Sequence, residues 1–419
     1  MSEVAACVGW DWAEREHVVS VREAGGCGIE TRRMRGSAEA LHEWANEMLG
    51  RFEGRTVLVA IDAGRCAVIA AFLGYPHIVL YPINPKAAAN LRTALYPSGQ
   101  KDDPIDSEML LEMVEKHRDR IRPLNPADPL SRELGLLSEQ RRKLDNDRKR
   151  TVNRLRDTLK SYFPQAAQLL GDLSTPMACA FLEKWPSLEA LQRSRDETIV
   201  AFFRHHGSRS SAKIQERLAI IRSAVPLTSD RALLAAGVSN VRALVGVIRA
   251  YLDAIADLEA TISEAYLAHP DHALIDSFPG LGPVLGPRVV AILGTDRTRY
   301  DSAESLQRLS GVAPVTRRTG GRKGLATVHR RLRRPKFMHQ TLVEWAGCSI
   351  AHSAWARAFY QLKRAQNPQM THYAILRELA YKWVRILFQC WQQDQKYDEA
   401  LHQAELARRG SPIAARLAA

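Results

Sequence analysis

Cysteine is scarce in this sequence, and the spacing of the few cysteines excludes the common uses of the residue. The chain has six in 419 residues, with no Cys-x-x-Cys pair and no histidine at zinc-site spacing. They are Cys7, Cys27, Cys66, Cys179, Cys348 and Cys390. This scatter favours reduced structural thiols over a disulfide framework or a zinc site, so we expect a cytoplasmic protein.

A secretion signal, a membrane span and an excess of acidic residues are also lacking. The first four residues do not open a signal peptide, and no uninterrupted apolar run approaches the roughly 18 residues of a membrane helix. Asp and Glu number 46 against 59 Lys and Arg, which gives a net charge of +13. This balance suggests a polyanionic partner, and a basic protein without such a partner is the alternative.

The first 120 residues alternate short apolar runs with amphipathic segments. We expect strands at 5–10, 16–22, 56–62 and 77–81, and helices at 38–52, 66–73, 86–95 and 106–120. This order predicts an α/β sheet domain over residues 1–122.

Beyond Pro123, Pro126 and Pro129 the pattern becomes helical. Two apolar series, at seven-residue intervals and offset by four, form an a/d heptad seam near residue 255. They are Leu244, Tyr251, Leu258 and Ala265, with Ile248, Ile255 and Ile262 between them. The seam predicts a coiled coil over 123–270, built from two antiparallel long helices with the helical segment 165–240 inserted at the far end. The seam could pack within the chain or between subunits.

The last part, residues 271–402, reads as a mainly helical domain. The Ala- and Arg-rich tail, 403–419, is expected to be disordered.

Four acidic residues in the first quarter of the chain have a pattern typical of a metal site. Asp11 and Asp62 each end an apolar run, whereas Asp103 and Asp106 lie three apart at the start of an expected helix. Singly, each suits a turn or a helix cap. Gathered in one pocket they would repel one another unless they bound cations, and carboxylate oxygens suit Mg²⁺ or Mn²⁺. In a basic chain, the set predicts phosphodiester chemistry on nucleic acid.

A glycine-rich turn near residue 280 is a second candidate. The segment 278–283, FPGLGP, precedes an apolar helix and resembles a helix-hairpin-helix. Gly280 and Gly282 would let the backbone approach a DNA phosphate closely, at the start of the following helix. An ordinary helix-packing turn is the alternative.

A basic, glycine-containing loop is the third candidate. Residues 317–336 include nine Lys or Arg and no acid, which generic phosphate binding would explain. Thr319 is flanked there by Arg317, Arg318, Gly320, Gly321, Arg322 and Lys323. A hydroxyl among arginines and glycines is also an arrangement suited to a nucleophile that attacks phosphorus, with the basic residues holding the phosphates.

Together, the motifs resemble one family over about residues 5–405. The matching segments are 8–17 (VGWDWAEREH), 80–85 (LYPINP), 96–106 (YPSGQKDDPID), 278–282 (FPGLG) and 310–317 (SGVAPVTR). They resemble the DEDD-motif insertion-sequence transposases of the IS110 family, relatives of the Piv/MooV DNA invertases.

The resemblance implies an N-terminal RuvC-like (ribonuclease H-like) domain, a coiled coil and a C-terminal transposase domain with a nucleophilic serine. It implies that Asp11, Asp62, Asp103 and Asp106 hold metal, and that the hydroxyl becomes covalently joined to DNA. It further implies guidance by a noncoding bridge RNA that pairs with target and donor DNA. Dimers would assemble into tetramers whose composite sites join the acids of one subunit to the hydroxyl of another.

Two positions depart from the family pattern. Asp62 stands where the family has Glu, and Thr319 stands where it has the serine. The β-branch of threonine restricts its rotation and crowds attack. Ser310, Thr316 and Thr327 are the alternative hydroxyls nearby.

The leading hypothesis is therefore an RNA-guided transposase or recombinase, located in the bacterial cytoplasm at the nucleoid and without a membrane partner. Three alternatives remain: a protein-guided invertase, a catalytically inactive nucleic-acid-binding protein derived from a transposase, and a structure-selective resolvase.

Overall fold

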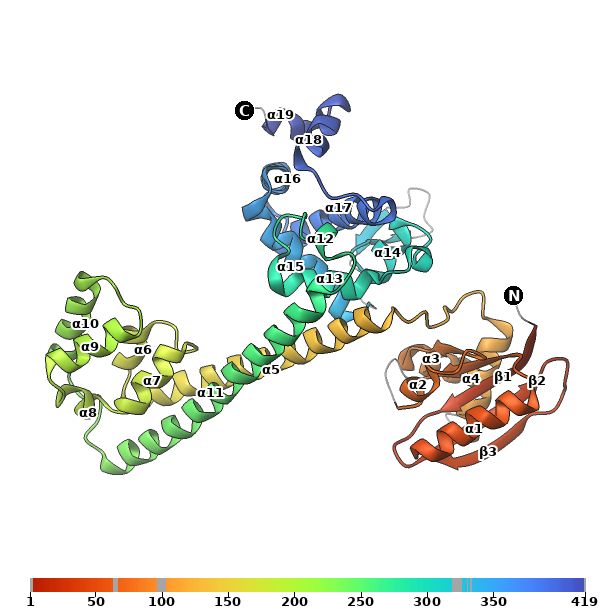
Figure 1. Cartoon of the computed structure of the whole chain (residues 1–419), viewed down its shortest axis with the longest axis horizontal. Helices are drawn as coiled ribbons and strands as arrows, with labels where there is room; N and C mark the ends of the chain where they lie inside the picture. The colour runs from red at the N-terminus through yellow and green to blue at the C-terminus, as the bar shows by residue number, and fades with distance from the viewer. Residues whose placement is uncertain are drawn as a thin grey trace. The chain divides into compact units, whose positions relative to one another are not determined.

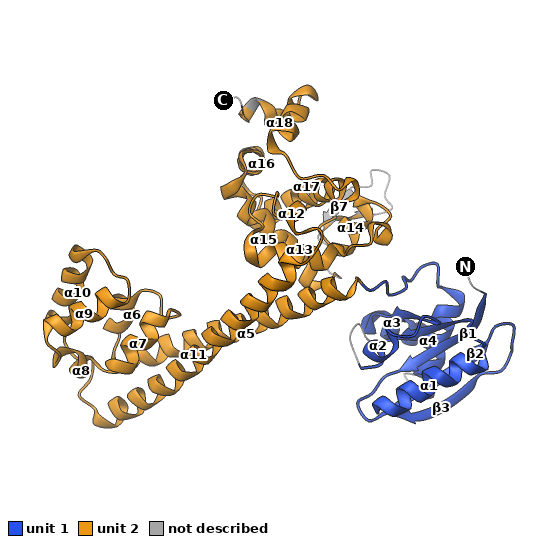
Figure 2. Ribbon diagram, in the orientation of Figure 1, with its two compact units in different colours: residues 1–126 blue, residues 127–419 orange. Residues whose placement is uncertain are grey.

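A mixed five-stranded sheet forms the centre of the first unit in the computed structural model, which describes residues 3–62, 67–95, 103–318, 326–329, 331 and 334–417. The chain divides into two units, 1–126 and 127–419 (Figures 1 and 2). The strands are β1 (Val4–Asp11), β2 (Glu16–Glu23), β3 (Glu30–Arg35), β4 (Thr56–Ile61) and β5 (Ile78–Pro82). Their order is β3-β2-β1-β4-β5; β1 pairs antiparallel with β2 and parallel with β4. The expected α/β character of this part is confirmed.

Helices cover both faces of this sheet. One face packs against α1 (Ala38–Arg51) and α2 (Ala67–Phe72), where the Trp10 ring lies 4.9 Å from Trp44 and 5.2 Å from Phe72. The other face packs against α3 (Pro85–Leu95) and α4 (Asp103–Lys116). Burying one large apolar side chain stabilises the folded state by about 1.5–3 kcal/mol, so the apolar cores on both faces stabilise the sheet.

Strand β3 was not predicted from the sequence. Its sequence, ETRRMR, contains one apolar residue, and none of its side chains is buried. It lies at the sheet edge, where Arg32 pairs with Glu47 and Arg33 with Glu16. Because charged residues are common on edge strands, an apolar–polar alternation does not reveal such a strand.

The second unit begins with two long helices that pack along each other, α5 (Pro129–Tyr162) and α11 (Arg231–Leu267). Leu244, Ile248, Ile255 and Ile262 of the heptad seam are buried within the chain. Between the long helices in sequence, five short helices (Figure 1) pack around an apolar core that they share with parts of α5 and α11. They are α6 (Gln165–Leu170), α7 (Pro176–Lys184), α8 (Leu188–Gln192), α9 (Asp196–His205) and α10 (Ser211–Ser223).

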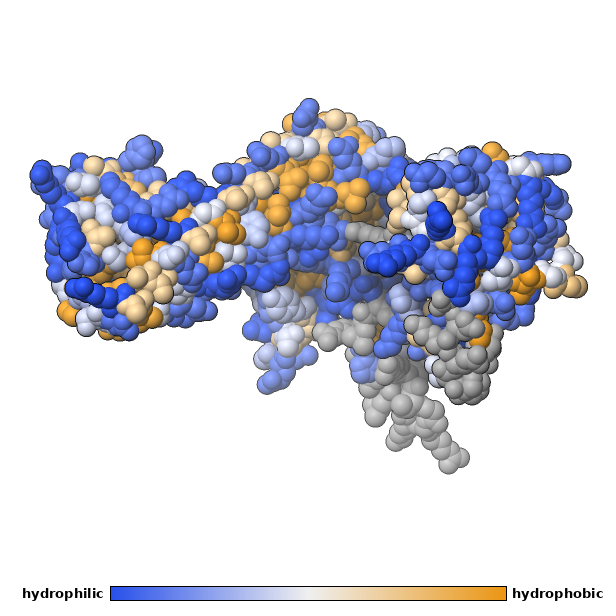
Figure 3. Space-filling model, turned by 90° about the horizontal axis from the view of Figure 1, so that it is seen from below, coloured by the Kyte–Doolittle hydropathy of each residue, from blue (hydrophilic) through white to orange (hydrophobic). Residues whose placement is uncertain are grey.

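Helix α11 is more apolar than we expected from the sequence, in which no long uninterrupted apolar run is present. Among the described helices, it alone is long and apolar enough to cross a membrane by length and composition. Arg242 and Arg249 interrupt its apolar residues, so no continuous run marks it in the sequence. Its seam packs on α5, and hydrophobic side chains such as Val247 remain exposed along the helix pair (Figure 3).

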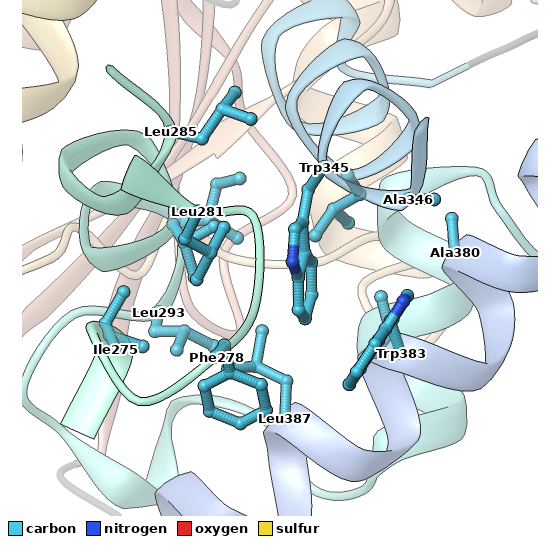
Figure 4. Packing of buried hydrophobic residues seen from close by; sticks show 14 of the residues in the cluster. Ile275, Phe278, Leu281, Leu285, Leu293, Trp345, Ala346, Ala380, Trp383 and Leu387 are labelled. Carbon is cyan, nitrogen blue, oxygen red and sulfur yellow. The ribbon is translucent and has the colours of Figure 1, made fainter. Parts of the chain in front are cut away.

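The remaining elements build a helical module around an aromatic core. They are α12 (His272–Ile275), α13 (Gly282–Leu293), η1 (Arg297–Arg299), α14 (Ala303–Ser310), β6 (Val315–Arg318), β7 (Ala326–His329), α15 (Lys336–His352), α16 (Ala354–Gln366) and α17 (His372–Gln393). Figure 4 shows Phe278, Trp345 and Trp383 packed together, with ring centroids 5.6 Å apart for Phe278–Trp345 and 5.1 Å for Trp345–Trp383. These rings fill the core of the module, where Trp345 of α15 packs against Trp383 of α17.

The structure describes two helices in and next to the tail that its composition predicted to be disordered. Residues Glu399–Arg408 form α18 and Pro412–Leu417 form α19. Asp398 caps α18 by accepting hydrogen bonds from the amides of Ala400 and Leu401, while Leu406 and Ile413 pack against the aromatic core. Capping and two apolar contacts therefore order a segment whose composition suggested disorder.

Candidate functional site

Asp11 and Asp62 lie side by side at the carboxyl ends of two neighbouring strands of the sheet. Strands β1 and β4 are parallel neighbours, with Trp10 opposite Ile61. Asp11 ends β1 and Asp62 directly follows β4. Since parallel strands lie about 4.8 Å apart, both carboxylates start from adjacent positions at the carboxyl edge.

Helix α4 brings Asp106 to the same region. Gly9 on β1 makes this possible, because a Cβ there would come within 1.7 Å of the Ser107 carbonyl oxygen. The helix is also fixed by a hydrogen bond between the buried Ser20 and Ser107 hydroxyls, 2.7 Å apart. Asp106, in the first turn of α4, is only 4% exposed. The side chain of Asp103, the first residue of α4, lies outside what the structure describes.

The electrostatics show that Asp62 and Asp106 interact. Burial raises the pKa of Asp62, and the negative charge of Asp106 raises it further. Arg92 of α3 opposes this shift, and its Nε lies 2.5 Å from Oδ1 of Asp106. The contact is an ion pair without an aligned hydrogen bond. Two partly dehydrated carboxylates and one cation therefore share this edge of the sheet.

This arrangement stops short of a complete metal-binding group. Within the described part of the chain, no three His, Cys, Asp or Glu side chains are grouped closely enough to hold a metal ion. The prediction that the four acids converge on a metal ion therefore stays a prediction, for Asp11, Asp62 and Asp106 as well as for Asp103. Arg92 was not predicted as a site residue, and its only signal in the sequence was a cation near the end of the helix that precedes the acidic turn.

The predicted nucleophile loop joins β6 to β7. The two strands are antiparallel, with Arg317 opposite Thr327. Thr319, Gly320, Gly321, Arg322 and Lys323 lie outside the described residues, as do the side chains of Arg317, Arg318 and Thr327. Among the alternative hydroxyls, Thr316 is exposed. Ser310 is fully buried and its hydroxyl donates to the Gln307 carbonyl oxygen, so it is not accessible to DNA.

The glycine-rich turn has a structural explanation that does not need nucleic acid. Gly280 has φ +81°, and a Cβ there would come within 2.8 Å of the Ser349 amide nitrogen on α15. Trp345 of α15 donates to the Pro279 carbonyl oxygen at 3.0 Å. Gly282, in contrast, is exposed at the start of α13 with nothing near its missing side chain. Only Gly282 remains available for a phosphate.

Comparison with known proteins identifies the family. A model of DEDD transposases of the IS110 type, described as "Transposase", matches residues 8–164, and one described as "Transposase IS116/IS110/IS902 family" matches residues 272–361. The chain belongs to this transposase family. The first match contains all four acids, and the second contains the turn at Gly280 and the loop at Thr319.

Curated relatives match most of this chain. The "Mini-circle putative transposase for IS117" of Streptomyces coelicolor is 28% identical and covers 93% of this chain and 95% of its own length. The "Insertion element IS116 uncharacterized 44.8 kDa protein" of Streptomyces clavuligerus is 26% identical over 80% of this chain and 82% of its own. The "Insertion element IS900 uncharacterized 42 kDa protein" of Mycobacterium paratuberculosis is 25% identical over 87% and 90%. As a transposase, the protein binds DNA and belongs to a class of enzymes that cut and transfer DNA strands.

Proposed function

We propose that this transposase cuts and rejoins DNA with two sets of residues that lie far apart in the sequence. Asp11, Asp62, Asp103 and Asp106 form the acidic set, and Thr319 is the covalent nucleophile. The observation that carries the proposal is geometric: Asp11 and Asp62 lie at the carboxyl ends of the neighbouring parallel strands β1 and β4, and α4 packs against β1 with Asp106 buried in its first turn. The direction of the Asp62 pKa shift, raised by burial and by Asp106, agrees with this placement. A carboxyl group whose pKa is shifted by burial and by a neighbouring acid is typical of functional sites.

The chemistry of the donor side chains suits a divalent cation, and the described donors do not by themselves form a group of three. Members of the DEDD family generally depend on divalent metal, and the donors here are hard carboxylate oxygens, which suit Mg²⁺ or Mn²⁺. The repulsion between Asp62 and Asp106 is the kind of unfavourable interaction that a bound cation relieves. A cation bound there supplies positive charge that stabilises the phosphodiester as it is attacked.

The proposed covalent step uses the Thr319 hydroxyl. Its oxygen loses a proton, forms a bond to phosphorus and displaces one DNA strand, whose departing oxygen takes up a proton. The new threonine–DNA phosphodiester keeps the strand attached until the reverse attack by another strand end. Arg317, Arg318, Arg322 and Lys323 would neutralise the phosphates, and Gly320 with Gly321 would let the backbone approach them.

The RuvC-like assignment, the guide RNA and the assembly follow from the family likeness. The strand order β3-β2-β1-β4-β5, with acids after the first and fourth strands and on a later helix, supports a ribonuclease H-like domain. The net charge of +13 suits a complex with DNA and a noncoding bridge RNA. We expect dimers that assemble into a tetramer, in which one subunit's acids act with another's Thr319.

Covalent trapping tests the enzyme. Full-length protein, the RNA transcribed from DNA flanking the gene, and the element-end DNA should give a protein–DNA adduct with Mg²⁺. Thr319→Ala and Asp106→Asn should abolish the adduct, whereas Thr316→Ala should retain it. Absence of any adduct and of strand exchange with the cognate RNA and DNA would overturn the proposal.

A second function is favoured by the two departures from the family pattern. Asp62 in place of Glu and Thr319 in place of Ser would suit an inactive nucleic-acid-binding protein derived from a transposase. That protein would bind the same DNA without forming an adduct, and Thr319→Ser with Asp62→Glu would be needed to create one. Full activity of RNA-free protein would instead identify a protein-guided invertase.

A further inference from the structure

A cavity of about 650 Å³ opens at the base of the β6–β7 hairpin. Its wall consists of the segment 311–314, which leads directly into β6, together with residues at and just after the end of β7, on α16 and α17, and in the connection between these two helices. This volume falls within the range of about 300–1,000 Å³ that is typical of small-molecule sites. It suits one or two nucleotides and not a base-paired duplex.

Hydrogen bonds hold the wall of the cavity in place. Gln307 of α14 donates from Nε2 to the Tyr381 carbonyl oxygen at 2.6 Å, and its own carbonyl oxygen accepts from the Ala313 amide at 3.1 Å. One residue thus fixes the 311–314 segment to α17. A Cβ on Gly311 would collide with the Arg334 side chain, so Arg334 packs closely against the start of the 311–314 segment. The cavity is therefore preformed.

The wall is strongly cationic. Arg331, Lys363, Arg377 and Lys382 line it, against a single carboxylate, Glu378. Glu378 pairs with Lys363 at 2.8 Å. Outside the cavity, burial lowers the pKa of His339 to about 4; the charge of Arg334 and, to a smaller extent, that of the cavity residue Arg377 lower it as well. An anion in the cavity would meet several positive charges in a partly dehydrated setting.

The same wall has an apolar side. The half-buried Tyr381 follows Arg377 by one turn of α17 and directly precedes Lys382, and Met370 and Phe359 also line the cavity. Aromatic and apolar faces beside cations are the combination by which proteins bind unpaired nucleotides, since the base stacks while the phosphate is neutralised.

We propose that this cavity binds an unpaired nucleotide of the DNA strand, with its base against Tyr381 and its phosphate held by Arg377 and Lys382. The inference rests on the proposed function, because DNA is taken as the substrate. The four residues of β6 span about 13 Å at the usual rise of a strand. A strand held in the cavity would therefore run a few nucleotides from the proposed nucleophile loop and orient the DNA for attack.

Single-stranded DNA binding by the full-length protein tests this site. The probe is a fluorescent ten-nucleotide oligothymidylate, followed by anisotropy across a salt series without RNA or metal. Lys382→Ala should weaken binding and reduce the slope of log affinity against log salt by about 0.7, which is the share of one phosphate contact. Arg385→Ala, an exposed arginine of α17 outside the cavity, is the matched control and should change neither quantity.

The aromatic contact is tested with a second matched pair. Tyr381→Leu should weaken binding at least fivefold without altering the salt slope, whereas Tyr381→Phe should bind as the parent does. An iododeoxyuridine oligonucleotide should photo-crosslink to the peptide containing Tyr381. Equal losses in Lys382→Ala and Arg385→Ala, or crosslinks only elsewhere, would overturn the proposal. Tighter binding of the matching RNA that is also weakened by Tyr381→Leu and by Lys382→Ala would assign the cavity to RNA and overturn the proposal for DNA.

This assay contains no cleavage step. If no covalent adduct forms but the cavity variants lose binding, the proposed chemistry fails and the cavity assignment stands. If adducts form and the cavity variants bind normally, only the cavity assignment fails.

Discussion

Arg92 and Asp106 form an ion pair at the carboxyl edge of the N-terminal sheet, with Nε and Oδ1 2.5 Å apart. The carboxylate is 6% exposed at the side chain and the guanidinium 27%. Their contact lacks an aligned hydrogen bond, so the pairing is mainly one of charge. Arg92 therefore partly neutralises the acids that are proposed to hold metal, and a bound cation would have to share or replace that neutralisation.

We expect Arg92→Gln to tighten divalent-metal binding. Removing a positive charge a few ångströms from the site takes away a repulsion on the order of 1–3 kcal/mol at an effective dielectric near 20, which corresponds to roughly a tenfold change in affinity or more. Mn²⁺ titration of the full-length protein, followed by electron paramagnetic resonance of the free ion, measures the change directly.

Lys86→Gln is the control for that experiment. Lys86 lies on the same helix, α3, and is exposed, so its loss changes the net charge equally without touching Asp106. Equal Mn²⁺ affinities for the parent and Arg92→Gln would contradict the role given to Arg92. Asp106→Asn should abolish the high-affinity binding in either background.

Gly9→Ala should displace α4 from the sheet. The added Cβ would meet backbone atoms of Ser107 and Leu111 at 1.7 and 2.5 Å, and backbone cannot rotate away as a flexible side chain can. We expect a loss of at least about 3 kcal/mol in the free energy of unfolding, at the upper end for overpacking, together with loss of Mn²⁺ binding.

Gly28→Ala provides the comparison, since a Cβ there meets nothing within 4 Å. Urea unfolding curves of the two variants should separate clearly. A Gly9→Ala protein as stable as Gly28→Ala would show that α4 does not lie against β1.

The positions of Asp11 and Asp62 were predictable because buried parallel strands appear as apolar runs, and each run ends in its acid. The placement of α4 was less predictable. The sequence pattern predicted a helix that starts at Asp106, whereas α4 starts at Asp103. What fixes α4 is the absence of a side chain at Gly9, on another strand. The Arg92–Asp106 pair was not predictable, since it depends on how α3 and α4 cross. Edge strand β3 and helix α18 were missed because neither has an apolar periodicity of its own.

Asp128 should give the second unit a specific acid sensitivity. Burial alone would raise its pKa, but hydrogen bonds from Ser131 and Thr295 outweigh this and lower the pKa from 3.8 to about 2. A carboxyl whose folded pKa is depressed stabilises the fold above its unfolded pKa and loses that contribution as pH falls. The apparent melting temperature should therefore fall between pH 4 and pH 2 partly through Asp128.

Asp128→Asn separates the two roles of this side chain. Asparagine can still cap α5 through one oxygen, but it cannot accept from Thr295 through the other, so this part of the pH dependence should disappear. Asp128→Ala should lose the cap as well, at a cost of about 1 kcal/mol. Calorimetric scans from pH 7 to pH 2 measure both, with Asp157→Asn, an exposed carboxylate on α5, as the control. An unchanged acid limb in Asp128→Asn would contradict the assignment.

The two glycines of the turn before α13 should respond differently to alanine. At Gly280, positive φ and contact with the α15 backbone combine, so Gly280→Ala should destabilise the protein by about 2–4 kcal/mol. At Gly282, only the backbone conformation is strained, at about 1–2 kcal/mol.

If Gly282 approaches a DNA phosphate as a helix-hairpin-helix predicts, Gly282→Ala should weaken duplex DNA binding well beyond its effect on stability, because a Cβ would stand between the amide and the phosphate. Parallel measurements of unfolding and of duplex binding decide the matter: unchanged duplex affinity in folded Gly282→Ala would leave the turn a packing element for α15 alone.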